Sequence, residues 1–82
     1  MERAAFERLR WRCTRRGMLE VDMVLGRFLK AVFWKCSESE QQAFIALADY
    51  DDMALWRLIS GRDECEDARL TPVVAMLREC KP

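Results

Sequence analysis

The segment Val21-Asp22-Met23-Val24-Leu25-Gly26-Arg27-Phe28-Leu29-Lys30-Ala31-Val32 determines the fold class of this chain. Its apolar residues recur at intervals of three, four, seven and eleven, the spacing of one α-helical face: Val21, Val24, Leu25, Phe28 and Val32. We therefore predict a helix from about Met18 to Trp34 with this face buried. Gly26 weakens the helix by about 1 kcal/mol relative to alanine, and we expect it to mark a close helix contact.

Helical spacing continues on both sides of this segment, and no alternating β-branched run of strand length occurs. Five helices are predicted, at residues 2–13, 18–34, 38–48, 53–59 and 72–80. Besides the face already described, the residues expected to point inward are Phe6, Leu9, Cys13, Ala43, Phe44, Leu47, Ala48, Leu55, Trp56 and Ile59. We therefore expect an all-α protein, a compact five-helix bundle that forms a single domain over residues 1–82.

Capping signals mark most of the helix ends. Ser37-Glu38-Ser39-Glu40 has the pattern of a capping box, with its first serine as N-cap and Glu40 three residues later. Asp51-Asp52 is expected to cap the fourth helix, and Ser60-Gly61 to close it. Gly17 occupies the place of a left-handed C′ residue after the first helix.

The start of the last helix has two interpretations. Thr71 fits an N-cap that is followed by Pro72 at the first helical position. Alternatively, the helix starts near Glu66 and is kinked at Pro72.

Composition narrows the class of protein. With 82 residues, 51% of them hydrophobic, and fourteen basic groups balanced by fourteen acidic ones, the chain has the make-up of one small folded domain. No apolar run approaches the roughly 20 residues that a membrane-spanning helix needs, and the charged start, Met1 to Arg8, is unlike a secretory signal. We expect a soluble cytoplasmic protein that is not inserted in a membrane and is a monomer.

Cysteine and histidine usage argues against an enzyme. The four cysteines stand at 13, 36, 65 and 80 without a Cys-x-x-Cys pair, and histidine is absent, so a zinc site is poorly supported. Reduced and mostly buried thiols are the simpler expectation. Without histidine, the chain also has no Ser-His or Cys-His dyad of its own.

Charge is balanced overall but not locally. Residues 1–35 carry nine basic and four acidic groups, whereas residues 36–82 carry five basic and ten acidic ones. Such asymmetry suits docking onto a partner with complementary patches. The alternative is that the two halves pair with each other within the fold.

Two functions are conceivable for the basic connection after the first helix. Arg10, Arg12, Arg15 and Arg16 with Trp11 have the make-up of a nucleic-acid patch, in which guanidinium groups bind phosphates and an indole stacks on a base. The helix after Gly17 nevertheless begins with two acids, Glu20 and Asp22, where phosphates would lie. Nucleic-acid binding is therefore the weaker hypothesis.

A protein contact explains the unit Arg16-Gly17-Met18-Leu19-Glu20 better. Gly17 permits a sharp turn with bare backbone, Arg16 carries a fork for a partner's carboxylate, and Met18-Leu19 supplies an apolar anchor. Glu20 lies in the first helical turn, where the helix dipole favours a carboxylate. The structural alternative is a C-cap glycine with a local ion pair between Arg16 and Glu20, worth under about 1 kcal/mol.

The run Arg15-Arg16-Gly17-Met18-Leu19-Glu20-Val21-Asp22 resembles the Arg-Gly-x-x-Glu signature of the succinate dehydrogenase flavinylation factors, small five-helix proteins labelled antitoxin-like in some older naming. The resemblance extends over nearly the whole chain. It includes Trp11, Phe28-Leu29, Ser37-x-x-Glu40, Phe44 with Leu47, and Asp51-Asp52 followed by Leu55-Trp56.

The resemblance implies an assembly chaperone and not an enzyme. Such a factor binds the flavoprotein subunit of succinate dehydrogenase, and often that of fumarate reductase, and promotes covalent attachment of FAD to a client histidine. FAD then belongs to the client, and no cofactor is expected on this chain. The implied partner-binding residues are Trp11, Arg15, Arg16, Gly17, Met18, Leu19, Glu20, Asp22, Asp51 and Asp52.

Two alternatives remain. The first is a small nucleic-acid-binding or antitoxin-type regulator, against which the zero net charge and the two acids after Gly17 argue. The second is a minimal enzyme that uses Asp51 and Asp52 as paired carboxylates. Adjacent residues at a helix start point in different directions, and an aspartate N-cap needs no catalytic explanation.

Overall fold

The computed structural model describes residues 1–81 as five α-helices and one short 3₁₀ helix, with no strand in that range. In chain order the elements are α1 (Arg3–Cys13), α2 (Leu19–Ala31), η1 (Phe33–Lys35), α3 (Glu38–Ala48), α4 (Asp52–Ile59) and α5 (Thr71–Glu79). The predicted all-α architecture of five helices is confirmed. None of these helices is both long and apolar enough to cross a membrane.

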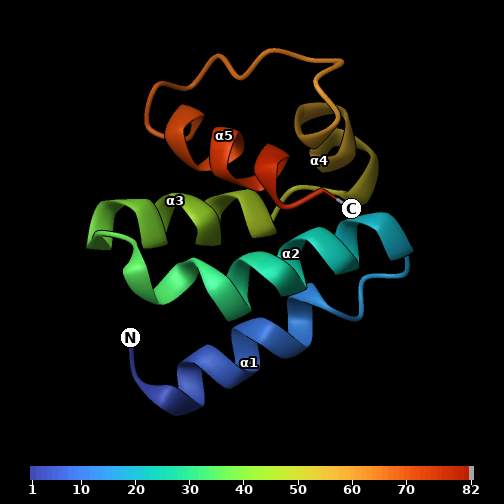
Figure 1. The fold of residues 1–82 in the computed structure, drawn as a ribbon. Helices are drawn as coiled ribbons and strands as arrows, with labels where there is room; N and C mark the ends of the chain where they lie inside the picture. The colour runs from blue at the N-terminus through green and yellow to red at the C-terminus, as the bar shows by residue number, and fades with distance from the viewer. Residues whose placement is uncertain (82) are drawn as a thin grey trace.

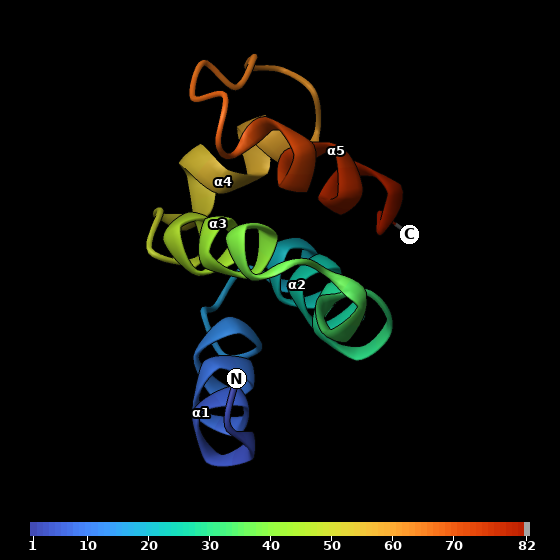
Figure 2. The same cartoon turned by 90° about the vertical axis from the view of Figure 1, so that its left-hand side faces the viewer.

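The helices are arranged in three layers, with α1 along one side of α2, α2 beside α3 in the middle, and α4 with α5 on the far side (Figure 1). The same order is seen after a quarter turn (Figure 2). Since α2 touches α1, η1, α4 and α5, it is the central element of the fold. Its predicted face is buried at Val21, Val24, Leu25 and Phe28.

Three phenylalanines from consecutive elements meet at the centre of the core. The rings of Phe28 and Phe44 stack with centroids 4.6 Å apart, and Phe33 meets Phe44 edge-on at 5.8 Å. Aromatic pairs in these geometries add about 0.5–1.5 kcal/mol each beyond the area that they bury. The core therefore joins α2, η1 and α3 through one aromatic cluster.

The second helix is shorter than predicted. It ends at Ala31, and Val32 leaves helical geometry at φ −120°, after which η1 begins. In an unbroken helix, Phe28 and Phe33 would point about 140° apart, because each residue advances by about 100°. The break lets both rings reach the core; Val32, predicted to be buried, is half-buried, and Leu29 and Phe33 are buried instead.

Other core predictions need smaller corrections. Phe6, Ala48 and Trp56 are half-buried and pack against the edge of the core. Of the four cysteines only Cys13 is fully buried, so the expectation that most of them would be buried is wrong. Gly26 packs against Thr14, the C-cap of α1, but a Cβ atom there would lie at an ordinary van der Waals distance of 3.4 Å from Cγ2 of Thr14, so the predicted close helix contact is not confirmed.

Most of the predicted caps are confirmed. Ser37 accepts a hydrogen bond from the Glu40 N–H, and the Glu40 carboxylate accepts one from the Ser37 N–H, which completes the capping box. Asp51 caps α4 by accepting from the Ala54 N–H at 2.8 Å, whereas Asp52 is the first residue of the helix. After the Ser60 C-cap, Gly61 takes φ +86°.

Two helix ends differ from prediction. α1 ends with Thr14 as C-cap, its hydroxyl donating to the Arg10 carbonyl, so Gly17 is not the C′ residue although its φ of +109° is left-handed. α5 begins at Thr71 with Leu70 as N-cap, and the Thr71 hydroxyl donates back to the Asp67 carbonyl. Thr71 is therefore inside the helix, and the alternative start near Glu66 is wrong.

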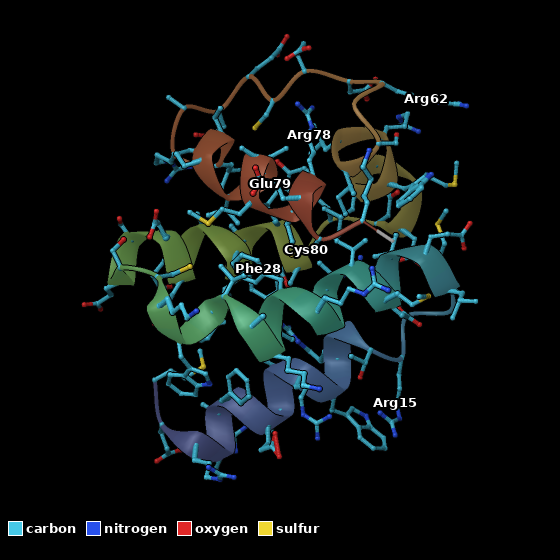
Figure 3. All side chains as sticks on the ribbon, viewed as in Figure 1. Arg15, Phe28, Arg62, Arg78, Glu79 and Cys80 are labelled. Carbon is cyan, nitrogen blue, oxygen red and sulfur yellow. The ribbon has the colours of Figure 1, made fainter. Side chains whose placement is uncertain are left out.

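Two arginines hold the beginning of the link between α4 and α5: Arg57 pairs with the Asp63 carboxylate at 3.1 Å, and Arg78 bonds to main-chain carbonyls. Nε of Arg78 donates to the Leu58 carbonyl at 2.9 Å, and Nη2 donates to the Asp63 carbonyl at 3.1 Å (Figure 3). Both acceptors are main-chain atoms, so the guanidinium fixes the beginning of the link against α5.

Candidate functional site

The connection from α1 to α2 is a rigid turn. The Arg16 N–H donates to Oδ1 of Asp22 at 3.1 Å, so the first turn of α2 holds the backbone that enters it. Gly17 follows with its left-handed φ of +109°, a conformation that costs a residue with a Cβ about 1–2 kcal/mol. The sequence therefore needs glycine at this position for the path of the backbone.

Arg16 closes a clasp across the fold, which we call the Arg16 clasp. Its Nε donates to Oδ1 of Asp52 at 2.6 Å, Nη1 donates to the Ala48 carbonyl at 2.5 Å, and Nη2 donates to the Tyr50 carbonyl. The Arg16 side chain is only 13% exposed, and that of Asp52 is 25% exposed. The clasp thus joins the α1–α2 turn to the α3–α4 turn, which lie at the same end of the molecule (Figure 1).

This geometry corrects two expectations. Arg16 does not extend toward a partner, because its guanidinium is already occupied by a carboxylate and two carbonyls. It also does not form the local pair with Glu20 that was the structural alternative, since its ion pair is with Asp52. Glu20 is exposed at the start of α2.

Around the clasp, several apolar side chains are exposed. Leu19 is 68% exposed, Trp11 60% and Met53 57%, and the partly exposed Tyr50 lies between α3 and α4. A Cβ atom on Gly17 would meet nothing within 4 Å, so the missing side chain leaves open space outside the turn. Exposed aromatic and aliphatic groups on a rigid support are typical of protein interfaces.

Trp11 and Arg15 form one unit on this surface. The Arg15 guanidinium carbon lies 3.5 Å from the centroid of the Trp11 ring, and Figure 3 shows Arg15 beside an indole below the turn. Such a cation–π contact contributes about 0.5–1 kcal/mol when exposed. It orders both side chains and presents a flat surface with a positive charge.

The other members of the predicted nucleic-acid patch are paired with acids. Arg10 pairs with Glu7 at 2.9 Å and Arg12 with Asp49 at 3.6 Å, while Arg16 is in its clasp. The Arg10 hydrogen bond lowers the pKa of the Glu7 carboxyl, which keeps that acid charged. Little free positive charge remains for phosphates here, and the antitoxin-type alternative is not supported.

These ion pairs also show how the basic first half and the acidic second half of the chain meet in the fold. Arg12 with Asp49 and Arg16 with Asp52 both join the basic first half of the chain to the acidic second half. The two halves therefore pair with each other at this end of the fold, as the alternative proposed.

The structure separates the ten predicted contact residues into two groups. Those with exposed side chains or backbone are Trp11, Arg15, Gly17, Leu19, Glu20 and Asp51. The others are directed into the protein: Met18 packs against the core, Asp22 holds the Arg16 N–H, and Arg16 pairs with Asp52. The second group supports the surface that the first group forms.

Cys13 lies in the core beneath this surface. Burial raises the pKa of its thiol to about 11, and the opposing effect of the Arg16 and Arg12 charges is smaller. The thiol therefore stays protonated at neutral pH, when it is a poor nucleophile. Its chemistry is that of a packing residue.

Sequence reasoning missed three contributors to the site. The carbonyls of Ala48 and Tyr50 are acceptors in the clasp, and no side-chain pattern marks a carbonyl acceptor. Met53 is a third, with 57% of its surface exposed. Its place directly after Asp52, at the start of an amphipathic helix, was the available signal.

Comparison with known proteins gives consistent results. Residues 7–81 match the model of a family described as flavinator of succinate dehydrogenase. The FAD assembly factor SdhE of Xylella fastidiosa (strain Temecula1) is 36% identical over 92% of this chain and 76% of its own length. Proteins of the same name from Methylococcus capsulatus and Vibrio cholerae are each 42% identical, covering 87% and 82% of this chain and 84% and 77% of their own. No solved structure matches the chain.

Proposed function

Since this chain belongs to the family of succinate dehydrogenase flavinators, we propose that it is an assembly chaperone for the flavoprotein subunit of that enzyme. In this role it binds the subunit and promotes covalent attachment of FAD to it. The flavoprotein subunit of fumarate reductase is a second client of the same kind. The factor works in the cytoplasm as a monomer, and the FAD stays with the client.

The chain contributes geometry to this reaction, and the bond-forming chemistry belongs to the flavin. The chain has no histidine and no Gly-x-Gly-x-x-Gly motif, and residues 1–81 contain no strand. The strand–turn–helix unit that usually binds a dinucleotide is therefore absent from this range. A chaperone that holds the client's histidine and flavin in a reactive arrangement lowers the barrier by positioning alone.

The observation that carries the proposal is the bare backbone of Gly17 on a rigid turn. Its backbone is held on both sides, by the Arg16 clasp before it and the start of α2 after it, and no atom fills the space where a side chain would project. A client surface can approach this backbone closely and find the turn already ordered. Preordered contacts avoid the entropy that is lost when a loop must fold on binding.

The neighbouring residues complete the contact. Leu19 and Trp11 supply exposed apolar area for the client. The Glu20 carboxylate can accept a charge-assisted hydrogen bond from it. No side chain in the described structure caps the first turn of α2, so the N–H groups of the exposed Leu19 and Glu20 are left for a carbonyl of the client.

The test uses two variants with the same strain and different size. Gly17→Ala and Gly17→Arg both place a Cβ at φ +109°, and both should lose about 1–2 kcal/mol of folding stability. Covalent flavin fluorescence on the client band of a denaturing gel then measures function. We expect Gly17→Arg to lower the flavin yield at least tenfold below that of Gly17→Ala, at equal melting temperature.

Glu20→Ala is the companion variant. Its exposed carboxylate should contribute only a few tenths of a kcal/mol to folding. We nonetheless expect weaker client binding and a lower flavin yield. Equal yields for both glycine variants, together with wild-type behaviour of Glu20→Ala, would show that this turn is only a helix connection.

A further inference from the structure

A second exposed surface lies at the other end of α2. There the chain leaves the helix at Val32, and η1 turns Phe33 into the core and Trp34 outward. Trp34 is 52% exposed, and its ring lies 4.7 Å from that of Phe6 and edge-on to Phe33 at 5.7 Å. The indole is therefore supported on two sides while about half of its surface faces solvent.

The segment around this end of α2 is basic, although Glu2 and Glu38 from neighbouring elements lie near η1. Residues 23–36 include Arg27, Lys30 and Lys35 and no acid. Lys30 and Lys35 are exposed and form no ion pair with the described residues, whereas Arg27 donates to the Cys80 carbonyl at 3.2 Å. This contrasts with the first surface, where most basic groups are neutralised.

We propose that the protein has a second docking surface, for an acidic segment of the client flavoprotein. This surface consists of Trp34, Lys30 and Lys35, and we call it the η1 surface. The inference rests on the proposed function, because it names a second contact with the same client. The indole is the anchor and the two ammonium groups attract carboxylates around it. An aromatic anchor that is already held in place is the kind of residue that dominates interface energies.

An acidic protein segment fits this surface better than an anionic membrane does. A helix that lies on a bilayer needs a free apolar face. The apolar face of α2 is already used in the core, where Val24, Leu25 and Phe28 are fully buried. One half-exposed indole with two lysines suits a narrow acidic peptide or loop.

The two docking surfaces are far enough apart to fix the orientation of a bound client. α2 has thirteen residues, so its ends are separated by about 20 Å. One contact at each end of a rigid helix fixes the orientation of a bound client, whereas a single small patch leaves it free to rock. Two-point contact therefore matches a role in which two parts of the client must be held in register.

The test is a matched pair of charge reversals measured against the client's apo flavoprotein subunit. Lys30→Glu/Lys35→Glu reverses the η1 surface. Arg62→Glu/Lys81→Glu makes the same change in net charge at exposed positions elsewhere, with Arg62 on the α4–α5 link (Figure 3). We expect the first variant to bind at least tenfold more weakly in 50 mM salt and to lose much of the salt dependence of binding. The control should stay within twofold of wild type.

Two further measurements separate the outcomes. Wild-type client affinity of Lys30→Glu/Lys35→Glu overturns the inference, and its loss of sedimentation with phosphatidylserine vesicles would then assign the surface to lipid. Equal weakening by the control variant also overturns it, because the effect would be one of net charge. Glu20→Ala measured in parallel tests the proposed function itself: if it weakens binding and the η1 variant does not, only the second surface fails.

Discussion

Removal of the Arg16 clasp should destabilise the whole protein. In Arg16→Met the aliphatic stem is retained, but Asp52 and the carbonyls of Ala48 and Tyr50 lose their donors. A hydrogen bond to a charged group contributes about 1.5–3 kcal/mol, and breaking a buried ion pair costs about 3–5 kcal/mol. Because Asp52 is 25% exposed and water reaches part of the site, we expect a loss of about 2–4 kcal/mol.

That loss is large for this chain. A domain of 82 residues is typically stable by about 4–12 kcal/mol, so Arg16→Met removes a substantial share. Urea unfolding followed by circular dichroism measures it directly. Arg16→Lys is the matched control: it keeps a charge for Asp52 but lacks the planar fork that reaches both carbonyls, so its loss should be intermediate.

A double-mutant cycle with Asp52→Asn isolates the ion pair. We expect a coupling energy of about 1–2 kcal/mol, since the two side chains are in direct contact. If Arg16→Met unfolds within about 0.5 kcal/mol of wild type, the clasp does not support the turn and our reasoning is wrong.

The Arg16→Met variant also tests whether Arg16 supports the fold or contacts the client. If Arg16 acts only through global stability, its flavinylation defect should follow the unfolded fraction and disappear at a temperature where the variant is fully folded. A folded Arg16→Met protein that still fails to flavinylate its client would mean that Arg16 acts locally, by ordering the Gly17 turn or by contacting the client.

Three further outcomes can be measured. Phe28→Ala should cost about 3–5 kcal/mol because the ring is fully buried, whereas Trp56→Ala, at the half-buried edge, should cost less; equal losses in thermal melts would contradict this order. Because burial raises the pKa of the Cys13 thiol from 9.0 to about 11, its contribution to stability is complete below pH 9 and falls by about 2–3 kcal/mol as the pH rises through 11. Urea midpoints from pH 8 to 11 should therefore decline less steeply in Cys13→Ala than in wild type. Glu20→Gln should melt within about 0.5 kcal/mol of wild type yet weaken client binding in a titration, and unchanged affinity would remove Glu20 from the site.

Local signals predicted most of the fold. The spacing of apolar residues in α2 and the capping box at Ser37 each depend on neighbours within one or two turns, and the structure has both. The end of α2 could not be predicted this way. No local signal opposed a helix through Trp34, and the break at Val32 is favoured by the packing of Phe33 against Phe44, a residue eleven positions away.

Less of the site than of the fold could be predicted from the sequence. The segment around Gly17 was located, because an arginine-glycine turn between two helices is visible in the sequence. The role of Arg16 was not, because its acceptors are 32 to 36 residues away and two of them are main-chain carbonyls. Composition identifies which residues carry charge, but only the packed fold decides whether a charge is used internally or offered to a partner.

The α4–α5 link, anchored by Arg78, has a consequence for how this protein can vary and be engineered. Arg78 fixes the link at Leu58 and Asp63, and the Asp67 carbonyl accepts from Leu70 and Thr71 where the chain enters α5. Residues 64–66 lie between these anchors, on the side of the molecule opposite α1 (Figure 1). Insertions, tags or fluorescent labels should be tolerated at the exposed Glu64, in a segment whose ends are already held, but not at Cys65, whose side chain packs against the core.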